Sequence, residues 1–77
     1  MRVIDTVATG ANIKAMMRKR NLRVIDIQSR CCLQTQMAVY KWLRGDSIPT
    51  VDNLVILAEL FGCKIDDLIK TRRIRRF

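Results

Sequence analysis

The 77-residue sequence contains no histidine, which is the side chain used most often in general acid–base catalysis and a common zinc ligand. Glycine is scarce, with three residues, and none of them forms a glycine-rich phosphate-binding loop. The acidic residues fall mainly at the expected starts of helices, where they complement the helix dipole. We therefore expect neither enzymatic activity nor a bound cofactor.

Cysteine is also rare, and its pattern excludes the disulfide framework of a small secreted protein. The three cysteines are odd in number, and two of them, Cys31 and Cys32, are adjacent. A zinc site would need a carboxylate or a second chain to supply its fourth ligand, so we expect no metal. We interpret Cys31, Cys32 and Cys63 as buried structural thiols, because a free cysteine packs as a small hydrophobic side chain.

Long hydrophobic runs are absent. The longest apolar stretches have only a few residues, far fewer than the roughly 20 that a membrane span needs. Residues 1–5 lack the apolar region of a signal peptide, so we expect a cytoplasmic protein that does not enter a membrane. Apolar residues still make up 49% of the chain, which is enough for one packed core and argues against disorder.

Acidic residues are scarce. Seven acidic residues face 15 basic ones, which gives a net charge of +8 and a sequence pI of about 10.3. Such a balance attracts nucleic acid or anionic lipid, and charge by itself does not distinguish the two.

Residues 34–50 form the stretch around which the rest of the chain is organised. Thr35 is a good N-cap for a helix that ends at Gly45, a residue able to adopt the left-handed conformation. Val39 and Trp42 stand three residues apart and are expected in the core, so Trp42 is not expected to stack on bases. The outward face then carries Gln36, Met37, Tyr40, Lys41 and Arg44. This face could read base edges, and an ordinary amphipathic helix could also present it.

Four further helices are predicted around this stretch. Residues 1–9 favour a short extended arm, and the helical pattern begins at Gly10 and ends at Asn21. A second short helix runs from Val24 to about Cys31, with Asp26 placed to accept a hydrogen bond from a free N–H near its start. The fourth is capped by Thr50 and ended by Gly62, with Leu54, Leu57, Ala58 and Phe61 facing the core. The last begins near Ile65, with Asp66 and Asp67 in its first turn.

The tail, residues 71–77, is rich in arginine. Its simplest interpretation is a solvated end of the chain. Two functional alternatives are an arm that binds phosphate and an edge strand, because residues 73–75 alternate in polarity and residues 3–4 could pair with them.

Five short helices, with a tight turn between the second and third, describe a helix-turn-helix domain. The sequence resembles the XRE family, which comprises the phage-repressor and Cro-like helix-turn-helix domains. The matching pieces are residues 13–14 with 18–22, residues 24–28, residues 39–50 around Val39-Tyr40-Lys41-Trp42 and Arg44-Gly45, and residues 54–69. The resemblance implies an all-α, five-helix lambda-repressor-like fold over residues 10–70, with residues 1–9 and 71–77 as terminal arms.

Two departures from the family pattern concern the packing of the third helix. The turn before this helix is one residue longer than in the phage repressors, and Cys32 stands where they usually have glycine. Members of the family often pair an arginine of the first helix with a glutamate just after the tryptophan of the third. Met17 and Leu43 occupy these positions here, and because both charges are replaced together we predict that the two side chains touch.

The resemblance also implies which residues meet DNA. By position, the base-contacting residues are Thr35, Gln36, Met37, Tyr40 and Lys41, and the phosphate-contacting residues are Arg44, Arg23 and Arg18. Gln36 could pair with adenine, Lys41 could donate to guanine, and Met37 could meet a thymine methyl group. For each cation the alternative is a solvated surface charge.

The function implied is that of a sequence-specific DNA-binding transcriptional regulator that inserts its third helix into the major groove. Because one helix reads only a few base pairs, we expect a homodimer on an inverted repeat, with the fifth helix and the tail as candidate dimer surfaces. No separate domain for a small-molecule ligand is expected.

Two alternatives remain at this stage. One is a protein-interaction module on the same fold, such as an antitoxin or anti-regulator, which Ile74 and Phe77 would favour if both are exposed. The other is non-specific binding of nucleic acid or membrane through the tail, which would weaken steeply as salt rises.

Overall fold

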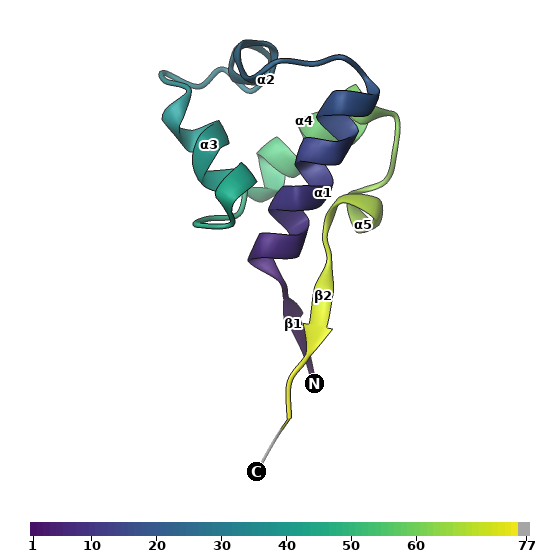
Figure 1. The fold of residues 1–77 in the computed structure, drawn as a ribbon. Helices are drawn as coiled ribbons and strands as arrows, with labels where there is room; N and C mark the ends of the chain where they lie inside the picture. The colour runs from purple at the N-terminus through teal and green to yellow at the C-terminus, as the bar shows by residue number, and fades with distance from the viewer. Residues whose placement is uncertain (76–77) are drawn as a thin grey trace.

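A computed structural model describes residues 1–75, in which five helices form a body and the two ends of the chain form a ribbon (Figure 1). The helices are α1 (Thr6–Lys19), α2 (Val24–Arg30), α3 (Met37–Arg44), α4 (Val51–Phe61) and α5 (Ile65–Leu68), and the strands are β1 (Arg2–Ile4) and β2 (Thr71–Arg73). The expected five-helix fold is confirmed. No helix within residues 1–75 has the length and apolar character needed to cross a membrane.

One hydrophobic core joins all five helices. Val39 and Trp42 of α3 are buried, as the spacing predicts, so Trp42 is a core residue. The four apolar positions expected on the inner face of α4 are buried as well. The buried residues that form this core are Ile13, Met17, Ile27, Cys31, Val39, Trp42, Leu54, Leu57, Ala58, Phe61 and Leu68.

Helices α1 to α4 all end in the same backbone motif. One residue at each of these ends adopts the left-handed conformation. In α1 and α2 it is the residue after the C-cap, Asn21 (φ 56°) and Cys32 (φ 54°). In α3 and α4 it is the C-cap itself, Gly45 (φ 84°) and Gly62 (φ 68°). The next N–H donates to the carbonyl five residues earlier, over 2.8 to 3.0 Å in the four helices. These bonds satisfy carbonyls that a helix end leaves free. The predicted ends at Asn21, Gly45 and Gly62 are confirmed.

The starts of the helices correct two predictions. Helix α1 begins at Thr6 and not at Gly10, because the Asp5 carboxylate accepts a hydrogen bond from the Ala8 N–H over 2.9 Å. The extended part of the N-terminal arm is therefore only Arg2–Ile4. Helix α3 begins at Met37, with Gln36 in the N-cap position. The Thr35 hydroxyl accepts from the Met37 N–H over 3.3 Å and so stabilises the preceding turn instead of capping the helix.

Other helix starts are as expected. The Thr50 hydroxyl accepts from the Asn53 N–H over 3.3 Å. The Asp26 carboxylate accepts from the Arg23 N–H over 2.8 Å, and this hydrogen bond together with the nearby Arg23 charge lowers the pKa of Asp26. Both contacts satisfy N–H groups at the start of a helix.

The cysteines are free thiols, but they are not all buried. Cys31 is buried and Cys63 is half-buried, and desolvation raises the pKa of both. Cys32 is exposed, which contradicts the expectation of three buried thiols. The reason is its place in the left-handed position just past α2, where the chain turns outward from the helix.

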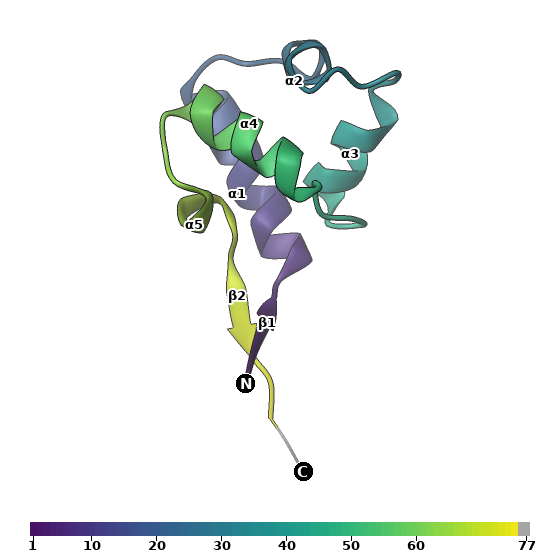
Figure 2. The same ribbon diagram turned by 180° about the vertical axis from the view of Figure 1, so that it is seen from behind.

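The two ends of the chain pair as an antiparallel ribbon that projects from the helical body (Figure 2). Arg2 lies opposite Arg73, Val3 opposite Arg72 and Ile4 opposite Thr71. The predicted pairing of the two ends is confirmed, although strand β2 covers Thr71–Arg73 and not residues 73–75. Ile74 is half-buried and not exposed, and its N–H donates to the Met1 carbonyl over 2.9 Å. Phe77 lies outside the described residues.

Helix α1 anchors the segment that leads into β2. The buried Thr9 hydroxyl accepts from the Lys70 N–H over 2.9 Å and donates to the Lys70 carbonyl over 3.3 Å. The Asp5 N–H donates to the same carbonyl over 2.8 Å. The Asn12 amide donates to the carbonyls of Asp67 and Leu68 over 2.8 and 3.0 Å. The ribbon is therefore fixed to the helical body at its base.

The first half of α1 packs closely against the C-terminal end of α3. Gly10 is buried, and a Cβ at this position would lie 2.3 Å from the Trp42 carbonyl oxygen and 2.8 Å from that of Leu43. A Cβ on Gly45 would lie 2.7 Å from the Val7 Cα. The lack of a side chain at both glycines lets the two backbones approach, and this contact fixes how α3 is held.

We expect Gly10→Ala to lower the free energy of unfolding by about 1–3 kcal/mol, because the new methyl group must push two backbone carbonyls apart. Helix propensity alone predicts the opposite sign, a gain of roughly 1 kcal/mol. Urea unfolding followed by circular dichroism measures the change. Ala15→Gly, at an exposed position of α1, is the control and should cost roughly 1 kcal/mol. A Gly10→Ala variant as stable as the parent would contradict the proposed contact.

Cys32→Gly should raise the free energy of unfolding by about 0.5–1 kcal/mol. A left-handed conformation costs a residue with a Cβ roughly 1–2 kcal/mol, and the greater freedom of glycine in the unfolded chain offsets part of this gain. Thermal unfolding of Cys32→Gly and of the control Cys32→Ala separates the backbone effect from loss of the thiol. Equal stability of the two variants would rule out the backbone explanation.

Candidate nucleic-acid interface

The outward face of α3 is exposed along its length and carries two cations beside two large, partly apolar side chains. Met37 and Tyr40 have exposed fractions of 55% and 44%, and Lys41 and Arg44 are also exposed. Gln36, at the N-cap, is half-buried. The predicted division of α3 into an inner and an outer face is therefore confirmed. Because Val39 and Trp42 hold the inner face in the core, the outer side chains are presented from a fixed helix.

The N-terminal end of α3 carries no negative charge. Its first turn contains no acidic residue, and no side chain caps it. Thr35, just before this end, is exposed. Free N–H groups and the helix dipole make such an end favourable for anions or hydrogen-bond acceptors.

Two of the three predicted phosphate-binding arginines form ion pairs. The Arg44 Nε lies 2.9 Å from an Asp46 carboxylate oxygen, and the Arg23 Nε lies 3.6 Å from an Asp26 oxygen. Both pairs are solvent-exposed, and such pairs contribute little free energy, so the guanidinium groups can exchange a carboxylate for a phosphate. Within residues 1–75, Arg18 and Lys41 have no acidic partner.

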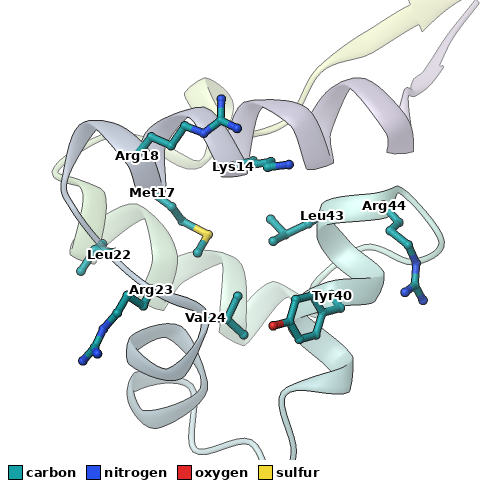
Figure 3. Close-up of a pocket in the computed structure, with 9 residues that line it drawn as sticks. All are labelled: Lys14, Met17, Arg18, Leu22, Arg23, Val24, Tyr40, Leu43 and Arg44. Carbon is teal, nitrogen blue, oxygen red and sulfur yellow. The ribbon is translucent and has the colours of Figure 1, made fainter.

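A pocket of about 410 Å³ lies between α1, the start of α2 and α3 (Figure 3). All three predicted phosphate-binding residues line it, together with Tyr40. Thr35, Gln36, Met37 and Lys41 do not line it, whereas Tyr40 and Arg44 belong both to the outer face of α3 and to this pocket. The pocket is lined by Lys14, Met17, Arg18, Leu22, Arg23, Val24, Tyr40, Leu43 and Arg44. Figure 3 shows the guanidinium groups of Arg18, Arg23 and Arg44 directed away from one another.

Met17 and Leu43 share this pocket. Their side chains are directed toward one another across its floor in Figure 3. Met17 is buried, and Leu43 packs against the core. At these positions the family often has a paired arginine and glutamate, and burying that pair removes both charges from water at a cost in free energy. The two apolar side chains here avoid this cost.

The fold and the exposed third helix define a helix-turn-helix domain. The family model described as helix-turn-helix matches residues 13–68, and the chain belongs to this family, the XRE-type helix-turn-helix domains. Comparison with curated proteins gives no significant match.

Two solved structures share the fold. One is the DNA-binding domain of BldD, with 22% sequence identity and a TM-score of 0.68 over 86% of this chain and 94% of that one. The other is the S. venezulae BldD DNA-binding domain, with the same identity and TM-score over 86% of this chain and 97% of that one.

Proposed function

We propose that the protein is a DNA-binding transcriptional regulator that inserts α3 into the major groove. The observation that supports this most directly is the exposed outer face of α3 with its cations Lys41 and Arg44, held by the buried Val39 and Trp42. The major groove is about 12 Å wide and accommodates a helix. The domains of similar fold are described as DNA-binding domains of BldD, and the family match supports the same role here.

Base reading is assigned to the start and outer face of α3. The Gln36 amide can donate to and accept from adenine, and the Lys41 ammonium group can donate to the acceptors of guanine. The Met37 side chain can contact a thymine methyl group. Thr35 and Tyr40 flank these residues and carry hydroxyl groups that can bond to a base edge or a sugar.

Phosphate binding is assigned to Arg44, Arg23 and Arg18. They approach the pocket from the end of α3, the start of α2 and the end of α1, so they can bind phosphates at more than one place along the backbone. Phosphate contacts fix the position of the protein on DNA and do not read the sequence.

A dimer completes the proposal. One recognition helix reads too few base pairs for a unique site, so two copies would bind an inverted repeat with their α3 helices one turn of DNA apart, about 34 Å. A regulator of this kind would act in the cytoplasm, where bacterial and phage DNA lies.

The double variant Gln36→Ala/Lys41→Ala should lose preference for the duplex that the parent enriches from a random pool. Each lost base contact is worth about 1–3 kcal/mol, so the preference over a scrambled duplex should fall by at least about tenfold. Fluorescence anisotropy with both duplexes measures the ratio. Lys19→Ala, on an exposed residue outside α3, removes a charge as a control and should leave the ratio unchanged. Unchanged preference in the double variant would refute base reading by α3.

A second candidate is a protein-interaction module on the same fold. Val51 and Val55, with exposed fractions of 72% and 47%, lie one turn apart on α4, outside the α3 face. A defined protein partner that Val51→Ser/Val55→Ser no longer binds, together with no duplex preference in the parent, would favour this candidate.

A further inference from the structure

The ribbon of β1 and β2 concentrates positive charge. Arg2, Arg72, Arg73 and Arg75 are all exposed, and neither residues 1–4 nor residues 71–75 include an acidic side chain. In the described part of the chain, the ion pairs are those of Arg23 and Arg44, so no carboxylate side chain there balances the arginines of the ribbon. The acidic residues nearest to the two strands in the sequence serve as caps, Asp5 for α1 and Asp67 for the start of α5.

The register of the ribbon places like charges together. Arg2 lies directly opposite Arg73, and cross-strand partners share one face of a sheet with Cβ atoms only about 4.5–5.5 Å apart. The Arg2 guanidinium donates to the Thr71 hydroxyl over 2.8 Å, which satisfies one N–H but neutralises no charge. Arg72 pairs with Val3 and so lies on the opposite face. Like charges opposite one another disfavour the ribbon unless an anion lies near them.

The ribbon is held in place before any partner binds. Its base is fixed by the hydrogen bonds of Lys70 with Thr9 and Asp5. Beyond this base it projects from the helices, and the molecule is 44 Å long against 23 and 21 Å in the other directions (Figures 1 and 2). A preformed ribbon presents its cations without a further ordering cost for the backbone.

The ribbon leaves the helical body beside one end of α3. Gly45, the residue after Arg44, packs against Val7, which lies three residues after β1. The C-terminal end of α3 therefore lies close to the first turn of α1, from which β1 leads directly into the ribbon. A long polyanion lying against α3 can extend to the ribbon, whereas a small anion cannot reach both.

We propose that the β1–β2 ribbon is a second DNA-contacting element, which lies in a groove of the same duplex beside the C-terminal end of α3 and binds its phosphates. This inference rests on the proposed function. A groove has phosphates along both edges, which matches arginines on both faces of the ribbon, and the major groove accommodates a two-stranded ribbon. A membrane presents anions on one side only. Edge pairing with a second copy would bring two sets of arginines together, and charged edges prevent such pairing.

The test compares two variants that lose the same charge. Arg72→Gln/Arg73→Gln alters the ribbon, and Lys19→Gln/Lys64→Gln removes two exposed cations at the end of α1 and the start of α5. Binding to the duplex enriched by the parent is measured over a range of salt concentrations. Because each phosphate contact contributes about 0.9 to the slope of log K against log salt, the ribbon variant should lower the slope by about two and the control should not.

Hydroxyl-radical footprinting locates the contact. The ribbon variant should lose protection only beside the C-terminal end of α3, and it should keep the parent's preference for the enriched duplex. Arg72→Lys/Arg73→Lys keeps the charge and should restore the slope. Circular dichroism checks that each variant retains its helices.

Two results would overturn the ribbon assignment while leaving the proposed function intact. One is an equal slope in the ribbon and control variants. The other is a ribbon variant whose slope of log K for DNA against log salt equals that of the parent, while its binding to phosphatidylserine vesicles is lost. This result would assign the ribbon to membranes. If the parent itself shows no duplex preference, the proposed function fails, and the ribbon inference fails with it.

Discussion

The close contact between α1 and the end of α3 is the constraint on which the rest of the structure depends. Gly10 faces the carbonyls of Trp42 and Leu43, and Gly45 faces the backbone of Val7. These contacts hold α3 by its backbone at one end, while Val39 and Trp42 hold it by side chains in the core. A helix that reads DNA must keep its outer side chains within narrow limits of position, and a backbone contact of this kind restricts rotation of α3 more than side-chain packing alone does.

Helix α1 also positions the ribbon. Thr9 and Asn12 bind the backbone between Asp67 and Lys70 on the way to β2, only one turn from the Gly10 contact. The two elements proposed to meet DNA are therefore fixed to the same helix, although they are far apart in the sequence. Loss of the Thr9 hydroxyl would leave the Lys70 N–H without its partner in a part-buried site, so this small polar contact links the two ends of the chain.

The sequence predicted those features that depend on local chemistry. Asn21, Gly45 and Gly62 end helices because their residue types tolerate the left-handed conformation, and the buried face of α4 follows from its apolar period. Several other features were wrong or missed, and most of these are also local, whereas the pairing of the two distant ends of the chain was predicted. The cap of α1 by Asp5 lies in a β-branched stretch that favours an extended chain, and the exposure of Cys32 follows from a backbone turn. The packing role of Gly10 and the Arg44–Asp46 pair were not predicted. Because the first helix was expected to begin at Gly10, this glycine was not expected inside a helix, where a lone glycine would have been a signal of close packing. The individual DNA contacts remain predictions.

Selection from a random pool of duplexes at physiological salt tests the central claim most directly. If α3 reads the major groove in a dimer, the enriched sequence is an inverted repeat whose half-site centres lie about one turn of DNA apart, roughly 34 Å. Absence of any enriched sequence, with weak binding that is lost as salt rises, would show that the positive charge attracts DNA without reading it and would contradict the account.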